Sequence, residues 1–497
     1  MSEEIQKLKS STTLGKFRLL LKDSFVFGGL SAFTKFFSLF LTPILTRLLS
    51  KDQYGSMDIL NPILGIAATL IICGMDSAVA RFYYATEDNN ERKKIISGGF
   101  CVQFSLNIII CTLLFFFKTT LLKTYLGDSY HPVQESYMNM IICIIFFSTP
   151  IRYAQNLLIW IFKRKHYVIL SAGFIVSNFI GMIAAIYWCQ DKLLGVFLGQ
   201  VVPAIVFACV AIFFIKDYFV LEIGKKILIP MLKYGAPLLI VAFIPALVPS
   251  LDRYTINKFL GLADVASYGI GYRVASLIAI PIMSINTAMG PFMLALHKEE
   301  GAEKLFNLIA YCIIIIISLL IMVMVILAPF IITTLATSAY LPGLIVVVPL
   351  SFYFLIEMLR SISAVGIDLS MKTYWNLILY PIAICFLYVV LRLLTPRFGI
   401  VGAANALAIS SLFNFLIFTF VGTRLYPFRY NVLKKVLMLF LGYYLALIML
   451  NFGSMYYFSI ALVILLSFII VSYFIFLSSE DRRQLLSVIK QRFQQKL

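Results

Sequence analysis

The feature that most constrains this chain is a series of apolar runs that are long enough to cross a membrane. Segments 95–117, 305–327 and 456–477 contain no charged residue and consist mainly of hydrophobic side chains. A helix needs about 20 such residues to cross the hydrocarbon core of a bilayer, at a rise of about 1.5 Å per residue. The runs therefore predict an all-α integral membrane protein.

Composition supports the same class. Hydrophobic residues make up 61% of the 497 residues and charged residues 13%, against about 45–50% and about 25% in ordinary globular domains. These values exclude a soluble globular protein. The eight cysteines lie in apolar runs without a CxxC pair, which argues against disulfide bonds and against a metal site.

Apolar runs between charge clusters predict about fourteen transmembrane helices. With the N-terminus in the cytoplasm, 28 Lys and Arg residues fall on the cytoplasmic side and nine on the other, as the positive-inside rule requires. Both termini are therefore expected in the cytoplasm. The predicted spans are 24–49, 55–80, 95–117, 137–162, 167–189, 193–215, 230–251, 264–293, 304–328, 343–366, 371–391, 399–421, 432–451 and 455–478.

The chain also resembles itself at an offset of 204–211 residues: segment 49–56 matches 260–267, and 195–196 matches 399–400. An offset of six helices, an even number, predicts two six-helix lobes of the same orientation, as in transporters with parallel repeats. The expected parts are a cytoplasmic amphipathic N-terminus (1–23), an N-lobe (24–215), a cytoplasmic linker (216–229), a C-lobe (230–421), two further helices (432–478) and a basic cytoplasmic tail (479–497).

Six basic residues lie in or near the predicted spans. A charge at the bilayer centre costs at least about 2.5–3.5 kcal/mol, so such residues normally face a polar interior. We expect them to line a cationic cavity that binds anionic cargo, because guanidinium groups match phosphate oxygens; snorkelling or structural pairing is the alternative. Four lie inside spans (Lys35, Arg152, Arg273 and Arg360) and two nearer the outer ends (Arg47 and Arg253).

Five acidic residues also lie in or near spans. They are candidates for pairing with these cations or for binding a coupling proton or sodium ion. Asp76 is expected to pair with the nearby Arg81 at a helix end. The five are Asp58, Asp76, Asp252, Glu357 and Asp368.

The sequence offers little for catalysis. It contains no GxxxxGK[ST] loop, and its three histidines are isolated in predicted loops. We therefore expect no catalytic residues, no metal and no cofactor. The net charge of +18 follows from the loop bias and from attraction to anionic membrane lipids, and it does not indicate nucleic-acid binding.

Several short motifs resemble a known family. Segment 42–50 followed by Tyr54-Gly55, segments 74–78 and 81–83, and then 237–238, 252–254 and 258–261 are similar to the O-antigen and polysaccharide flippases of the multidrug/oligosaccharidyl-lipid/polysaccharide (MOP) exporter superfamily. The resemblance covers essentially the whole chain. It implies a MATE-like fold.

The resemblance implies that the protein moves a polyprenyl-diphosphate-linked oligosaccharide, such as an O-antigen, capsule or exopolysaccharide repeat unit, between leaflets of a bacterial plasma membrane. It also implies alternating access, driven by a coupling ion or the membrane potential, and the polysaccharide polymerase and chain-length machinery as partners. Two alternatives stay open: a multidrug or cation antiporter of the same superfamily, and a flippase for the peptidoglycan precursor lipid II.

Overall fold

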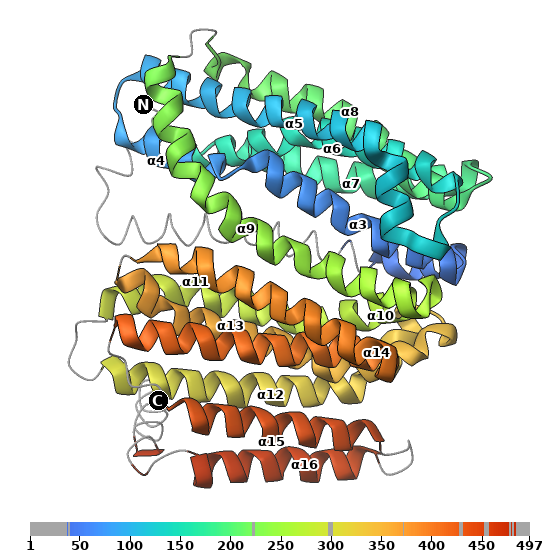
Figure 1. Ribbon diagram of the computed structural model, residues 1–497, viewed down its shortest axis with the longest axis vertical. Helices are drawn as coiled ribbons and strands as arrows, with labels where there is room; N and C mark the ends of the chain where they lie inside the picture. The colour runs from blue at the N-terminus through green and yellow to red at the C-terminus, as the bar shows by residue number, and fades with distance from the viewer. Residues whose placement is uncertain are drawn as a thin grey trace, which may run out of the picture. The chain divides into compact units, whose positions relative to one another are not determined.

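The computed structural model describes residues 37, 40–220, 224–296, 302–370, 372–426, 431–451, 457–476, 479 and 482–483. Every regular element within these residues is a helix (Figure 1), which confirms the all-α prediction. The amphipathic segment 1–23, most of the first predicted span and nearly all of the tail 479–497 lie outside the described residues. Of that first span, residues 40–48 are described as helical.

The chain divides into two compact units, residues 1–266 and 267–497. In the first unit, α9 packs against α3, α4 and α5. The expected linker is shorter than 216–229, because α9 already begins at Lys225; the division into repeated lobes stays a prediction. The helices are α3 (Lys51–Ile72), α4 (Met75–Ala85), α5 (Asn89–Leu126), α6 (Val133–Trp160), α7 (Arg164–Trp188), α8 (Lys192–Ile215), α9 (Lys225–Leu260) and α10 (Leu262–Ala275), which contains the boundary.

The second unit is built around α12, α13 and α15. Apolar side chains from these helices, such as Ile317, Phe352 and Leu439, form its core. Its α14 includes one non-helical residue, Gly399 (φ 62°, ψ −146°), which lies at the predicted start of the span 399–421. The helices are α11 (Ala279–Leu296), α12 (Ala302–Leu335), α13 (Val347–Leu369), α14 (Asn376–Leu425), α15 (Val432–Asn451) and α16 (Tyr457–Val471).

Short 3-10 and π segments connect several of these helices. They follow α5, precede α9 and α11, and precede α13 and α14; a π-helical turn follows α16. Their bounds are η1 (Gly127–Ser129), η2 (Lys216–Tyr218), η3 (Ser276–Ile278), η4 (Ser338–Val346), η5 (Thr373–Trp375) and η6 (Ser472–Phe476).

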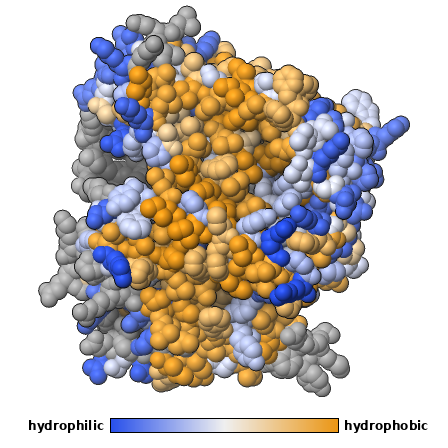
Figure 2. All heavy atoms as spheres, in the orientation of Figure 1, coloured by the Kyte–Doolittle hydropathy of each residue, from blue (hydrophilic) through white to orange (hydrophobic). Residues whose placement is uncertain are grey.

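The described residues hold eleven helices that are long and apolar enough to cross a membrane. Large hydrophobic side chains cover their outward faces: Phe116 is 75% exposed, Trp188 93% and Phe330 70%. Figure 2 shows the same predominance of hydrophobic residues on the visible face. Because such side chains are stable only against lipid tails or another apolar surface, the chain is a multi-pass membrane protein.

Local sequence sets where the helices begin and break. Ser50 and Gln53 form a capping box at the start of α3: the Ser50 hydroxyl accepts from the Gln53 N–H at 3.2 Å, and the Gln53 side chain accepts from the Ser50 N–H at 3.1 Å. The predicted span 55–80 is interrupted, because Cys73 (φ 48°) and Gly74 (φ 67°) adopt the left-handed conformation. This break starts α4 at Met75 and places Asp76 in its first turn.

Helix α5 is longer than the predicted span 95–117. It continues to Leu126, so the connection that the sequence assigns to 118–136 is largely helical. Contact with α6 accompanies this extension: the Lys118 ammonium group donates to the Asn139 side chain on α6 at 2.8 Å. Lysines at this end of α5 are therefore part of a packed helix rather than a loop.

Candidate functional site

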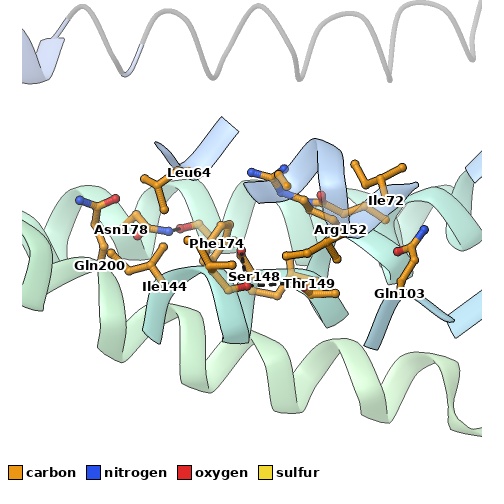
Figure 3. A pocket seen from close by; sticks show the side chains of 15 residues that line it. Leu64, Ile72, Gln103, Ile144, Ser148, Thr149, Arg152, Phe174, Asn178 and Gln200 are labelled. Atoms are coloured by element: carbon orange, nitrogen blue, oxygen red, sulfur yellow. Dashed lines mark hydrogen bonds between the residues drawn. The ribbon is translucent and has the colours of Figure 1, made fainter. Parts of the chain in front are cut away.

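A polar pocket lies inside the first unit between α3, α5, α6, α7 and α8 (Figure 3). Its volume is about 240 Å³, and its walls combine aliphatic side chains and Phe174 with polar groups. All the polar residues lie on helices that are candidate membrane spans. Polar groups facing hydrocarbon are costly, so their gathering here indicates a space for water or a ligand. They are Gln103, Ser148, Thr149, Arg152, Gln155, Asn178 and Gln200.

Arg152 supplies the positive charge of this pocket. It lies eight residues before the end of α6 at Trp160, which is about 12 Å along the helix. Its side chain is exposed to the pocket. Within the described part of the chain, Arg152 makes no hydrogen bond and no ion pair. The guanidinium can therefore bind an anionic group that enters the pocket.

Asp76 lies behind the pocket and accepts hydrogen bonds from two neighbouring helices. Its Oδ1 accepts from Gln103 Nε2 on α5 at 2.8 Å, and its Oδ2 accepts from Asn156 Nδ2 on α6 at 2.7 Å. Arg152 also acts on this carboxylate electrostatically. The expected pairing with Arg81 is wrong: the Arg81 guanidinium lies over the Tyr234 ring, 4.6 Å from its centroid.

Arg253 forms a buried ion-pair cluster with two of the predicted carboxylates. Its Nε lies 2.8 Å from Asp58 Oδ2, and its Nη1 lies 3.2 Å from Asp252 Oδ1. The Arg253 and Asp58 side chains are both 7% exposed. The geometry matches the structural-pair alternative, because the guanidinium binds carboxylates of its own chain.

Arg360 is enclosed in the same manner within the second unit. Its Nε lies 2.7 Å from Glu357 Oε2 one turn earlier on α13, and the Glu357 Oε1 accepts from Asn414 at 3.2 Å. The guanidinium also lies 5.5 Å from the Tyr380 ring centroid and 5.0 Å from that of Phe418. Arg360 is thus paired in this structure.

The other predicted residues do not line the pocket, and one of them is outside the described residues. Lys35 lies outside the described residues. Arg47 is exposed and donates to the Pro43 carbonyl at 3.0 Å, and Arg273 is half-buried in the last turn of α10. Asp368 is exposed near the end of α13. Of the predicted residues that the structure describes, Arg152 is the one that lines the pocket.

The sequence did not single out the pocket amides. Gln103, Gln155, Asn178 and Gln200 are uncharged, whereas the predicted intramembrane site residues all carry a charge. The signal that could have indicated them is the recurrence of amide side chains within otherwise apolar runs of neighbouring spans.

Lys435 is a further basic residue within a predicted span, 432–451, that the sequence did not single out. It lies in the first turn of α15 and is 2% exposed. Its ammonium group donates to Asn307 Oδ1 on α12 at 2.5 Å and lies 5.3 Å from the Tyr311 ring centroid. Lys435 is a buried cation of the second unit.

The described residues offer no cluster of side chains suited to a metal ion. Among the described residues, no group of three or more His, Cys, Asp or Glu side chains could hold a metal ion. The pocket chemistry comes from one guanidinium, four amides and two hydroxyl groups.

Solved transporter structures share this fold. The lipid II flippase MurJ in an inward closed conformation aligns with a TM-score of 0.70 at 14% identity, covering 90% of this chain and 99% of that one. An inward-facing multidrug resistance MATE family transporter of the MOP superfamily gives 0.66 at 15% identity, with 80% and 95% covered. A MOP superfamily transporter from Pyrococcus furiosus, described by the reverse polarity of its binding pocket, gives 0.59 at 14%, with 81% and 94% covered.

Sequence comparison identifies the family. No curated protein matches the chain. A family model described as "Polysaccharide biosynthesis protein" matches residues 20–297, more than half of the sequence and all the helices that line the pocket. The chain therefore belongs to the polysaccharide biosynthesis protein family, a flippase family, and has the fold of the MOP superfamily.

Proposed function

We propose that this protein carries a polyprenyl-diphosphate-linked oligosaccharide from the inner to the outer leaflet of a bacterial plasma membrane, with both termini in the cytoplasm. One observation supports the proposal above the others: Arg152 presents to a polar pocket within the membrane-spanning helices a guanidinium that no described residue binds through a hydrogen bond or ion pair. The lipid tail would stay in the bilayer while the polar head group passes through the protein. Membership of the polysaccharide biosynthesis protein family supports a cargo of this class.

The energetic cost of placing a charge in the membrane distinguishes Arg152 from Arg253 and Arg360. An arginine inside a membrane costs at least about 2.5–3.5 kcal/mol. For Arg253 and Arg360, carboxylates at 2.7–3.2 Å offset this cost. The Arg152 guanidinium has no such contact with a described carboxylate, so its attraction for an anion remains available to cargo. A guanidinium binds phosphate or carboxylate through two parallel hydrogen bonds.

The same charge disfavours the antiporter alternative. A cationic drug would have to approach Arg152, and the nearest carboxylate, Asp76, already accepts two amide hydrogen bonds. Like charges in a medium of low dielectric constant repel strongly. A lipid II flippase would share the preference for a diphosphate, so this alternative must be separated by phenotype. Loss of a lipid II flippase should be lethal under all growth conditions, whereas loss of an oligosaccharide flippase should remove one surface glycan.

The test is complementation of a deletion strain in the cell from which the gene comes. Wild-type protein should restore the surface glycan, whereas Arg152→Gln should restore less than about a tenth of it and lipid-linked oligosaccharide should accumulate inside. Arg424→Gln, the same change at an exposed arginine near the end of α14, is the matched control. Immunoblots of the membrane fraction check that all variants are inserted. Full glycan export by Arg152→Gln, or drug sensitivity without a glycan defect in the deletion strain, would overturn the proposal.

A further inference from the structure

The pocket beside Arg152 supplies both acceptors and donors, and internal hydrogen bonds fix how three of its amide side chains present them. Each of these three donates one of its two N–H groups to a partner that can only accept. Asn178 Nδ2 donates to the Phe174 carbonyl at 3.0 Å, and Gln200 Nε2 donates to the Val196 carbonyl at 3.1 Å. Gln103 Nε2 donates to the Asp76 carboxylate at 2.8 Å. Such partners fix the orientation of each amide, because the oxygen cannot take the place of the nitrogen.

Three further polar side chains also use their donors internally. Gln155 Nε2 donates to the Ser171 hydroxyl at 3.0 Å. The hydroxyl groups of Ser148 and Thr149 donate to the Ile145 carbonyl at 3.1 and 3.2 Å. Their oxygen lone pairs remain as acceptors. With the three fixed amides, six side chains therefore offer acceptors to the pocket.

The oxygens of the four pocket amides have no hydrogen bond from the described residues, yet they are not sealed from solvent. None is among the buried polar atoms that lack a partner. They are therefore accessible to an occupant of the pocket. The Arg152 guanidinium is the charged donor of the pocket, beside the second N–H of each amide. Figure 3 places Asn178 and Gln200 toward one end of the pocket, and Arg152 and Gln103 toward the other.

We infer that this pocket binds one sugar ring that carries an acidic group, with its hydroxyl groups donating to the amide oxygens and its carboxylate or phosphate accepting from Arg152. The inference rests on the proposed function in taking this sugar to be part of the cargo. The pocket volume is about 240 Å³. It is below the range of about 300–1,000 Å³ for drug-sized ligands, so a single ring fits better than an oligosaccharide.

Other ligands fit the same atoms less well. A sodium ion prefers oxygen ligands, and an ammonium group can donate to amide oxygens, but both would be repelled by Arg152. A neutral sugar would satisfy the acceptors and leave the guanidinium without a counter-charge. Phe174, which lines the pocket, offers an apolar surface for the C–H face of a sugar ring. The combination therefore selects a sugar acid or a sugar phosphate.

The experiment measures binding of small probes to the purified full-length protein in nanodiscs by saturation-transfer NMR, which detects millimolar affinities. The probes are methyl β-glucuronide, methyl β-glucoside and glucosamine. Sodium chloride is added as a competitor, with potassium chloride as its reference. Wild-type protein should bind the glucuronide at least tenfold more tightly than the glucoside. Arg152→Gln should reduce this preference to below about twofold, because the acidic group loses its counter-charge. Arg152→Lys, which keeps the charge but not the two parallel hydrogen bonds, should give an intermediate preference.

Removal of a hydrogen-bond acceptor should change the two affinities in a different way. Gln200→Leu should weaken both methyl glycosides by a similar factor and keep their ratio, because it removes a partner of the hydroxyl groups. Arg424→Gln should retain the wild-type affinities and serves as the control for lost surface charge. Size-exclusion chromatography of each variant checks that it is folded. Equal binding of glucuronide and glucoside, preferred binding of glucosamine, or displacement by sodium would each overturn the inference.

The two proposals can fail separately. If Arg152→Gln abolishes glycan export but the wild-type protein shows no preference for the glucuronide, the sugar-acid inference is wrong and the flippase function stands. If the glucuronide preference is present but glycan export is independent of the protein, the binding site stands and the proposed function is wrong.

Discussion

Gly74 and Gly235 bring the start of α4 into backbone contact with α9. A Cβ atom at Gly74 would lie 2.2 Å from the Gly235 carbonyl oxygen, and Gly74 has a φ of +67°. Both the close approach and the left-handed conformation exclude a side chain. The contact holds the break between α3 and α4 that gives Asp76 its place behind the pocket.

Gly74→Ala should therefore destabilise the protein. The left-handed conformation alone costs an alanine about 1–2 kcal/mol, and the clash with backbone atoms of Gly235 adds to this because backbone cannot rotate away. We expect a fall of several degrees in the thermal unfolding midpoint, measured by intrinsic fluorescence in nanodiscs. Gly65→Ala is the matched control, since a Cβ at Gly65 meets nothing within 4 Å. Equal midpoints for the two variants would contradict the role assigned to Gly74.

The Arg253 cluster predicts an asymmetry between its members. Arg253→Gln leaves Asp58 and Asp252 without their guanidinium, and breaking a buried pair in this way costs about 3–5 kcal/mol. Asp58→Asn leaves Arg253 beside Asp252, at 3.2 Å, and should cost less. Thermal unfolding of both variants should rank Arg253→Gln as the less stable. The double variant should cost less than the sum of the two, and a larger loss for Asp58→Asn than for Arg253→Gln would refute this account.

Asp76 should act as a structural acceptor for the pocket helices. In Asp76→Asn one carboxylate oxygen is replaced by an NH₂ group, which would face an N–H of Gln103 or Asn156. A hydrogen bond lost in this way costs about 1–3 kcal/mol. We expect a lower unfolding midpoint for Asp76→Asn and no change for Asp368→Asn, the same substitution at an exposed carboxylate. If both variants have the same unfolding midpoint, the two hydrogen bonds from amides to Asp76 contribute nothing measurable to stability.

The sequence predicted the spans because burial in a membrane leaves a local signal, a continuous apolar run. It could not predict the break at Cys73 and Gly74, since a glycine in an apolar run is compatible with a continuous helix. The left-handed conformation there is stabilised by contact with Gly235, which is 161 residues away in the sequence. The end of α5 was missed for a related reason: Lys118 resembles a loop residue until its contact with Asn139 is known.

The site was predicted in part. Charge at intramembrane positions pointed to Arg152, but whether an arginine faces a pocket or a carboxylate depends on tertiary contacts. Arg253 binds Asp58 across a separation of 195 residues, and no local pattern reports that pairing. The four pocket amides were overlooked because each is unremarkable alone. Their common property, a place in the lining of one pocket, is set by helices that pack together.

Lys435 gives a final prediction for the second unit. Its ammonium group is buried and donates to Asn307 Oδ1 on α12. Asn307→Leu removes that acceptor from the buried ammonium group, whereas Lys435→Met removes the charge and keeps much of the side-chain volume. Because removing one partner of a buried charge costs more than replacing the charge with a hydrophobic residue, Asn307→Leu should be the less stable variant, by several degrees in the unfolding midpoint. Lys434→Met, the same change at an exposed neighbour, should unfold as the wild type does. A Lys435→Met variant less stable than Asn307→Leu would show that the ammonium group itself stabilises the packing of α15 on α12.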